Sequence, residues 1–274
     1  MKKLTLLLTI LFINASTFCQ TQKESDSLVL LGGSIYANVV DKSNNLTYCT
    51  YRRGTEITFS YKYTDRNGKQ QYFVVNNGNS WDFTSVGNSS ESVKDFKLRV
   101  LNSNMNYNDP KHYQVEISYI IEKKGARTHT TGLIENEKNI WLHPPRQFLF
   151  QILELNPFPF IKYPLQIGRT WSWELEIGDQ WGDKRWKEWS GDIMNKCQYK
   201  ISGKETLNTA VGSLECYVVE SEAKSELGTT KLTSYFNEQF GFVKLMYTNI
   251  NSSTIEINIQ RVQQQMDNVF KPSF

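Results

Sequence analysis

The chain has 274 residues, of which 39% are hydrophobic and 13% are aromatic, and it carries a formal net charge of +3. This length can bury a core as one large domain or as two small ones. The small charge gives no electrostatic support for nucleic acid or an anionic membrane surface as a partner.

The first 19 residues have the pattern of a secretory signal peptide. Lys2 and Lys3 precede an apolar run over residues 4–13, and small and polar residues follow. The run is shorter than the roughly 20 residues that a membrane-spanning helix needs, and no later segment is apolar enough to cross a bilayer. The sequence therefore predicts export, to the periplasm or to the cell surface and beyond, and no integral membrane protein.

Cleavage after Cys19 would leave Gln20 as the first residue, with Thr17 and Cys19 as the small residues before the cut. The alternative is that Cys19 is lipidated, but Phe18 argues against this because a lipobox has a small residue before its cysteine. Removal of residues 1–19 would reduce the 31 basic side chains to 29, against 28 acidic ones.

Alternating polar and apolar residues predict strands over most of residues 20–262, which we expect to form a single, mostly β domain. Asp65 to Gly68 supplies the turn of the clearest hairpin, and the polar stretch 76–95 is expected to be a long loop or a flap. A second hairpin turns at residues 135–138. The predicted strands and hairpins of this half cover 56–75, 96–102, 112–121 and 128–143.

One segment near the middle of the chain predicts a helix. Pro144 and Pro145 precede the apolar residues of FLFQILEL, which favours a short helix over 146–155. The Pro-rich region 144–164 is also a possible joint between two subdomains, although it is too apolar for a free linker.

Strands resume at Trp171, and they alternate so that one face of the sheet is apolar. In TWSWELEI the side chains of Trp171, Trp173, Leu175 and Ile177 share a face. The remaining predicted strands are 195–208, 213–222, 229–240, 241–250 and 253–262, and residues 263–274 are expected to form a loose tail.

Five of the seven tryptophans lie within residues 170–191. A hairpin that turns inside 178–183 would place Trp189 opposite Trp171, and such aromatic pairs stabilise a sheet. Core packing explains some of these rings, and the alternatives are a wall for an apolar or lipid-like ligand and a platform for a glycan. The candidate ligand-binding residues here are Trp181, Trp186, Trp189 and Arg185.

The loop His143-Pro144-Pro145-Arg146 is a further candidate, because Arg146 could hold an anionic group; the alternative is a rigid corner. Pairing across the strands places His129 opposite Tyr119 and away from His112. No zinc motif, nucleophile motif or phosphate loop occurs, and no cofactor or metal is indicated.

Three cysteines would remain after cleavage: Cys49, Cys197 and Cys216. A hairpin that turns near 208–212 places Cys216 opposite Lys204, which is seven residues or roughly 23 Å from Cys197. A disulfide needs Cα atoms within about 7 Å, so these two should not be bridged. A bridge to Cys49 and three free thiols both remain open.

The segments YPLQIGRTW (163–171), YKISGKETLNTAVGSLECYVV (199–219) and YFNEQFGFVKL (235–245) carry a resemblance. Together, over about residues 163–262, they resemble uncharacterised exported proteins of Gram-negative bacteria with a domain of unknown function. The resemblance implies an open β-barrel like that of lipoprotein carriers, wrapped round a helix, and it assigns no functional residue.

These observations predict a mainly β protein in which a curved antiparallel sheet or open barrel covers one short helix. The expected function is that of a non-enzymatic envelope protein that binds an apolar or amphipathic ligand in the concave face of its sheet. The alternatives are a carbohydrate-binding module that uses exposed tryptophans, an assembly protein without a small-molecule ligand, and a hydrolase with a site built from scattered residues.

Overall fold

The computed structural model describes residues 28–31, 34–37, 50–76, 80–85, 91–101, 115–123 and 128–264, the first two segments as backbone only. The predicted signal peptide, Cys49, His112 and the tail beyond Gln264 lie outside the described residues. The strands are β1 Leu28–Leu31, β2 Ser34–Ala37, β3 Thr55–Thr64, β4 Gln70–Val75, β5 Trp81–Thr84, β6 Ser92–Val93, β7 Asp95–Val100, β8 Val115–Ile120, β9 His129–Glu135, β10 Asn139–Leu142, β11 Phe160–Lys162, β12 Thr170–Ile177, β13 Ile193–Thr209, β14 Gly212–Ser225, β15 Gly228–Asn237, β16 Gly241–Thr248 and β17 Thr254–Gln264. Two 3₁₀ helices are described, η2 Phe148–Leu155 and η3 Asp179–Trp181.

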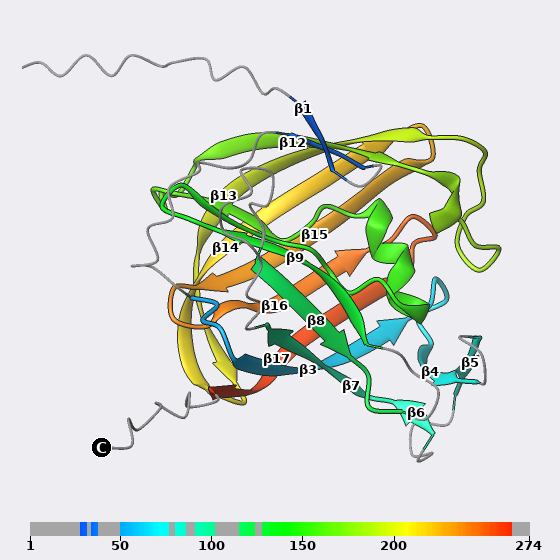
Figure 1. The fold of residues 1–274 in the computed structure, drawn as a ribbon, viewed down its shortest axis with the longest axis horizontal. Helices are drawn as coiled ribbons and strands as arrows, with labels where there is room; N and C mark the ends of the chain where they lie inside the picture. The colour runs from blue at the N-terminus through cyan, green and yellow to red at the C-terminus, as the bar shows by residue number, and fades with distance from the viewer. Residues whose placement is uncertain are drawn as a thin grey trace, which may run out of the picture.

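One antiparallel sheet curves into a nearly closed barrel (Figure 1). Strands β12 to β17 pair in chain order, β17 then pairs with β3, and β3 pairs with β7. Strands β7 to β11 continue the sheet in chain order, and β12 also meets β2. The predicted mainly β fold, with an open barrel around one short helix, is confirmed.

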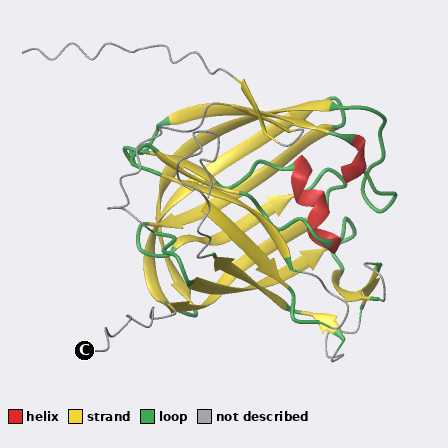
Figure 2. Cartoon of the chain, viewed as in Figure 1, coloured by secondary structure: helices red, strands yellow, loops and turns green. Residues whose placement is uncertain are grey.

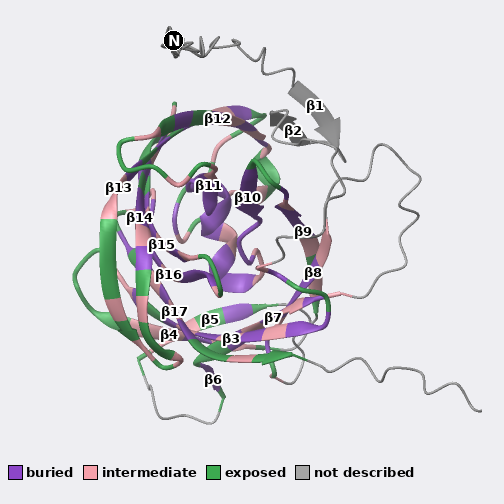
Figure 3. Ribbon diagram, turned by 90° about the vertical axis from the view of Figure 1, so that its left-hand side faces the viewer, coloured by how far each residue is buried: buried purple, intermediate pink, exposed green. Residues whose placement is uncertain are grey.

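The two-residue period of the sequence explains which side chains face the interior. In β12 the four predicted apolar side chains are all buried, whereas Ser172 between them is exposed. Aromatic rings also bridge β11 to the strands beyond it: the ring centroid of Phe160 lies 5.7 Å from that of Trp171 and 5.4 Å from that of Tyr199. The buried side chains form one core cluster, so the interior of the barrel is filled largely by side chains. Figure 3 marks the buried residues along the strands and in the segment inside the barrel.

Helix η2 lies inside the barrel, toward one end of it (Figure 2). All of its residues except Gln151 are buried. Its last carbonyl, that of Leu155, accepts hydrogen bonds from Thr230 Oγ1 at 2.7 Å and Asn195 Nδ2 at 3.2 Å. These bonds satisfy a helix-end acceptor that would otherwise be buried unpaired. The helix starts two residues later than the predicted 146, because Gln147 keeps an extended backbone.

The predicted Trp171–Trp189 hairpin is wrong. Trp171 pairs with Tyr199, and the second arm of the hairpin is β13, which begins only at Ile193. Residues 178–192 instead form a folded loop that contains η3, with a short bridge between Asp183 and Lys187. The pairing rule assumed a tight turn, and a fifteen-residue loop shifts every partner.

The prediction of one long loop over 76–95 is wrong in part. Strands β5 and β6 both pair with β4, so a small sheet stands here beside the barrel. Only Tyr63 and Thr64 of β3 pair with β4, whereas residues 56–60 along the same edge of β3 pair with β7. Aromatic contacts join the small sheet to η2: the ring centroid of Phe73 lies 6.0 Å from that of Phe148 and 5.8 Å from that of Phe150.

Cys197 and Cys216 are both buried and free, and they are not bridged to each other, as their separation predicted. Cys197 pairs with Ala223 in the β13–β14 hairpin, and Cys216 pairs with Glu205 rather than with Lys204. The hairpin closes with the pair Thr209–Gly212, and this turn places Cys216 opposite Glu205. The irregularity between Ile201 and Gly203 shifts the register only beyond that pair, toward Cys197. In the described residues, no helix has both the length and the apolar character to cross a bilayer.

Candidate functional site

A cavity of about 420 Å³ opens where the small sheet, η2 and the 178–192 loop meet. We call it the mouth cavity. It contains three of the five predicted site residues, Arg146, Trp181 and Arg185, which the sequence separates by up to 39 positions. Its lining consists of Ser80, Trp81, His129, Arg146, Gln147, Phe148, Gln151, Trp181 and Arg185.

A second, smaller cavity of about 40 Å³ lies deeper, and we call it the inner cavity. This volume holds roughly three water molecules at about 10–15 Å³ each. Arg146 and Trp181 line both cavities and so stand between them. The lining of the inner cavity consists of His143, Arg146, Glu154, Phe158, Leu175, Glu176, Ile177, Gly178, Gln180, Trp181 and Asp192.

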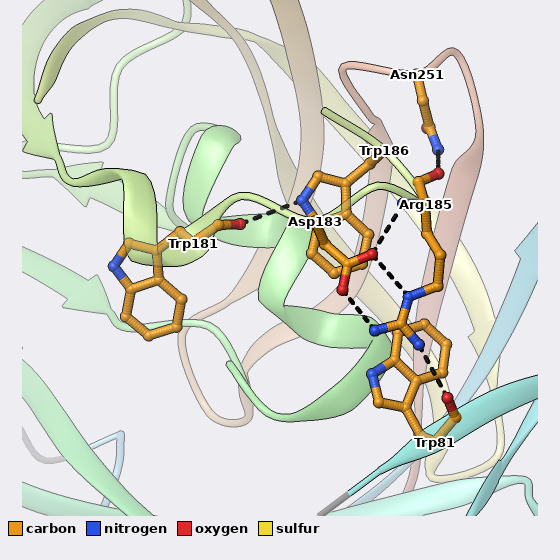
Figure 4. Close-up of polar contacts among 6 residues, drawn as sticks. All are labelled: Trp81, Trp181, Asp183, Arg185, Trp186 and Asn251. Atoms are coloured by element: carbon orange, nitrogen blue, oxygen red, sulfur yellow. Dashed lines mark hydrogen bonds and ion pairs between the residues drawn. The ribbon is translucent and has the colours of Figure 1, made fainter. Parts of the chain in front are cut away.

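Arg185 is a staple that holds the 178–192 loop to the small sheet (Figure 4). Its Nε and Nη2 donate to the two carboxylate oxygens of Asp183 at 2.8 and 2.5 Å, and its Nη1 donates to the carbonyl of Trp81 at 2.9 Å. The guanidinium also lies 3.6 Å from the centroid of the Trp81 ring. Partial burial alone would raise the pKa of Asp183, but the hydrogen bonds from Arg185 lower it. All three nitrogens of this guanidinium are thus bonded within the protein.

Trp186 belongs to the same packing unit. Its ring stacks against Trp81 with centroids 6.3 Å apart, its Nε1 donates to the carbonyl of Trp181, and the residue is only 8% exposed. Trp189 is half-buried against the core and lines neither cavity. The three candidate tryptophans therefore have different surroundings, and Trp181 is the one that faces both cavities.

Arg146 uses its donors differently. Its Nε donates to His129 Nε2 at 3.2 Å, and its Nη1 donates to His143 Nε2 at 3.3 Å. Its guanidinium also lies 5.3 Å from the centroid of the Trp181 ring. Within the described part of the chain, Nη2 has no protein acceptor, so this arginine keeps unused donors at a cavity wall.

Hydrogen bonds to the neighbouring strands β8 and β9 fix the backbone at His143, just before Arg146. The Tyr119 hydroxyl donates to the carbonyl of His143 at 2.6 Å, and the His143 amide donates to the carbonyl of Gly132 at 3.2 Å. Two prolines then set the course of the chain. Phe148, at the start of η2, has a positive φ of 56°, which costs a non-glycine residue on the order of 1–3 kcal/mol. Strain of this kind is concentrated at functional sites in proteins, and here it lies in the wall of the mouth cavity.

Glu154 is the one acidic residue of η2 and is only 4% exposed. Its Oε1 has no hydrogen-bond partner in the described structure; it lies 3.6 Å from His143 Nε2 and 4.0 Å from Arg146 Nη1. Burial raises the pKa of Glu154 to about 7, although the charge of Arg146 opposes the rise. A carboxyl group that is half protonated near neutral pH therefore faces the inner cavity.

The histidines beside it are neutral. Burial, followed by the charge of Arg146, lowers the pKa of His143 to about 3, and the same two causes lower the pKa of His129. His143 Nδ1 donates to the carbonyl of Pro144 at 2.8 Å, which leaves Nε2 as the acceptor for Arg146. The close approach of His143 to Glu154 is therefore not an ion pair.

Sequence reasoning paired His129 with Tyr119 correctly but missed that His129 and His143 converge on Arg146. It also missed Trp81, in the supposed loop, and Glu154, although a lone acid inside FLFQILEL was a signal of a buried polar site. In the described residues, no group of three or more His, Cys, Asp or Glu side chains could hold a metal ion.

Comparisons with known proteins give distant structural likenesses. The fold is similar to a candidate exported protein with a YmcC-like fold from Bacteroides fragilis, with a TM-score of 0.42 and 12% identity over 78% of this chain and 97% of that one. It is similar to a candidate lipoprotein from Parabacteroides distasonis (TM-score 0.41, 12% identity, 77% and 96% covered). It is also similar to the hypothetical lipoprotein YmcC from Escherichia coli (TM-score 0.34, 10% identity, 77% and 85% covered).

Their names describe candidate exported proteins or lipoproteins, the kind of protein that the sequence resemblance indicated. No protein-family model matches the chain, and no curated protein matches it. At this distance no residue role is transferred from the similar structures, so the site is interpreted from its own geometry.

Proposed function

We propose that this chain is an exported, non-enzymatic envelope protein that binds an amphipathic ligand in the mouth cavity. The observation that carries the proposal is the lining of that cavity. Its volume of about 420 Å³ lies within the range of about 300–1,000 Å³ that small-molecule sites occupy. Three aromatic side chains, Trp81, Phe148 and Trp181, provide apolar wall, and Arg146 provides a cation with unused donors.

The proposal places the ligand at the end of the barrel. The concave face of the sheet is occupied by η2 and by rings such as Phe150, which is fully buried and contacts Tyr61, Phe73 and Phe96. A ligand in the concave face would have to displace this packing, whereas the mouth cavity is already open in the structure.

A titration monitored by tryptophan fluorescence tests binding. Decanoate and decanol share a ten-carbon tail and differ in the head, and either should cause a saturable change in emission, because Trp81 and Trp181 line the cavity. Trp181→Ala should weaken binding at least tenfold. Trp189→Ala is the matched control, since Trp189 lies outside both cavities, and it should bind as the wild type does. A linear response to both compounds would contradict the proposal.

Export is tested separately. Expression of the full chain in a Gram-negative host should place the protein outside the cytoplasm, and intact mass should show the loss of residues 1–19. A mass increase at Cys19 would show the lipidated alternative instead. Full-length protein retained in the cytoplasm would contradict export.

The carbohydrate-binding and assembly alternatives predict other outcomes. A glycan-binding protein would be retarded in polysaccharide gels and Trp181→Ala would abolish the retardation. An assembly protein would bind neither decanoate nor decanol and would sediment in a concentration-dependent manner.

A further inference from the structure

The mouth cavity and the inner cavity share a wall, formed by Arg146 and Trp181, that suits the polar head of an amphipathic ligand. Arg146 lies between them, with Nη2 free of protein acceptors in the described structure, and the ring of Trp181 lies beside it. A tail in the mouth cavity would contact the aromatic wall while its head reached Arg146. Binding an oxyanion would satisfy donors that the protein leaves unused.

Glu154 lies on the lining of the inner cavity, 4.0 Å from Arg146 Nη1. Its Oε1 is buried without a partner, and a buried polar atom without a hydrogen bond costs about 1–3 kcal/mol. An ionised Glu154 would attract Arg146 and repel an anion. A protonated Glu154 would leave Arg146 to the ligand and could donate its own proton to a ligand oxygen.

We infer that the inner cavity is the head-group site of the proposed ligand and binds a carboxylate, with Arg146 as its cation and Glu154 as a carboxylic acid donor. This inference rests on the proposed function and adds the chemical class of the head. Arg146 is the one cationic residue on the lining of the inner cavity, and the acids Glu176 and Asp192, which are more exposed than Glu154, lie on the same lining. Because a single positive charge stands against these acids, a monoanion suits the site better than a dianion.

Proton uptake follows from this arrangement. The groups that face Glu154 are Arg146, the neutral histidines His143 and His129 behind it, and the acids Glu176 and Asp192 on the same lining. Since burial raises the pKa of Glu154 to about 7, the free protein is only partly protonated at neutral pH. One linked proton makes decanoate affinity fall roughly tenfold between pH 6 and pH 8.

The experiment compares four probes at pH 6 and pH 8 by the fluorescence titration above: decanoate, decanol, decyl phosphate and acetate. Decanoate should bind more tightly than decanol at pH 6 and lose about tenfold by pH 8, whereas decanol should bind equally at both. Acetate alone should bind weakly, because it lacks the tail.

Variants assign the roles. Glu154→Gln should bind decanoate at pH 8 as tightly as at pH 6, because its amide donates at every pH. Arg146→Met should lose at least tenfold for decanoate and little for decanol, while Arg146→Lys should recover part of the loss. Lys184→Met, at an exposed lysine of the 178–192 loop, is the matched control and should match the wild type.

Any other result of these titrations would overturn a specific part of the proposal. Equal affinity for decanoate and decanol at pH 6 would overturn the inference and leave the proposed function intact. If neither decanoate nor decanol binds, both the inference and the proposed function are wrong. Tighter binding of decyl phosphate than of decanoate would show that the head group of the ligand is a phosphate and not a carboxylate. If the affinity of the wild type for decanoate is the same at pH 6 and pH 8, Glu154 does not take part in binding, and this result does not depend on whether the variants fold.

Discussion

The two arginines at the mouth of the barrel stand in contrasting regions. Arg185 holds the 178–192 loop to the small sheet, and the Asp183 carboxylate and the Trp81 carbonyl accept hydrogen bonds from all three of its guanidinium nitrogens. Arg146 lies at the inner cavity, where it donates to two neutral histidines and lies 4.0 Å from an unpaired carboxyl oxygen. Both side chains have the same partial exposure of 26%, so exposure does not distinguish them.

The difference lies in what each charge is used for. A charge whose donors are all bonded inside the protein fixes the structure, and replacing it should cost stability. A charge that meets only neutral acceptors and a carboxyl of raised pKa contributes less to stability, and it remains available to a ligand. Each of the following predictions tests this contrast, starting with the largest effect.

Glu154→Gln should change how stability depends on pH. The pKa of Glu154 is about 7 in the folded protein and about 4.5 when exposed, so the folded state retains a proton that the unfolded state releases. Stability from this group is therefore complete below pH 4.5 and falls as the pH rises to 7, by about 3 kcal/mol. Urea unfolding at pH 4, 5.5 and 7.5 should show the variant gaining on the wild type as pH rises. Parallel profiles would show that Glu154 is not buried as described.

Arg185→Met should destabilise the protein by about 1–3 kcal/mol, because the carboxylate of Asp183 loses two hydrogen bonds from the guanidinium and the Trp81 carbonyl loses one; only the backbone amide of residue 185 still donates to the Asp183 carboxylate. Urea unfolding at pH 5.5 measures the loss, and Lys184→Met serves as the exposed control from the same loop. A loss of unfolding free energy below about 0.5 kcal/mol, as for an ordinary surface substitution, would show that Arg185 does not hold the loop to the small sheet.

Arg146→Met should cost about 1 kcal/mol at pH 5.5, less than Arg185→Met. Two histidine nitrogens lose their donor, but Glu154 is then mostly protonated, lies 3.6 Å from His143 Nε2 and can donate to it in place of the arginine. The same unfolding experiment applies. A cost equal to that of Arg185→Met would erase the contrast between the two arginines.

His143 should stay neutral in the folded protein as the pH is lowered well below 6.5, because burial holds its pKa near 3. Its ¹⁵N resonances should show protonated Nδ1 and bare Nε2 throughout, as the bond to the Pro144 carbonyl requires. This prediction involves no change in the protein, and an ordinary titration near pH 6.5 would indicate that the side chain is exposed to solvent.

The barrel wall could be predicted from the sequence, and the site only in part. Alternation in TWSWELEI identified the buried face of β12, because side chains on a strand must alternate. Alternation carries no information about loop length, so the partner of Trp171 was wrong. Arg146, Trp181 and Arg185 were identified as candidates by residue type, but the staple and the cavity depend on contacts between residues as far apart as Trp81 and Arg185.

Glu154 shows where pattern reasoning stopped. An acid among the apolar residues of η2 faces inward in this fold, next to residues from the β10–η2 connection and from β12. Its altered pKa arises from burial that only the closed barrel creates, so residue type alone could not indicate it.

The central claim is that an anionic head binds Arg146 together with a proton on Glu154. Isothermal titration of decanoate at pH 7, repeated in buffers of different ionisation enthalpy, measures that proton directly. The account predicts uptake of about half a proton per decanoate by the wild type, since a group with a pKa near 7 is half protonated before binding, and none by Glu154→Gln. Binding without proton uptake by the wild type would contradict it.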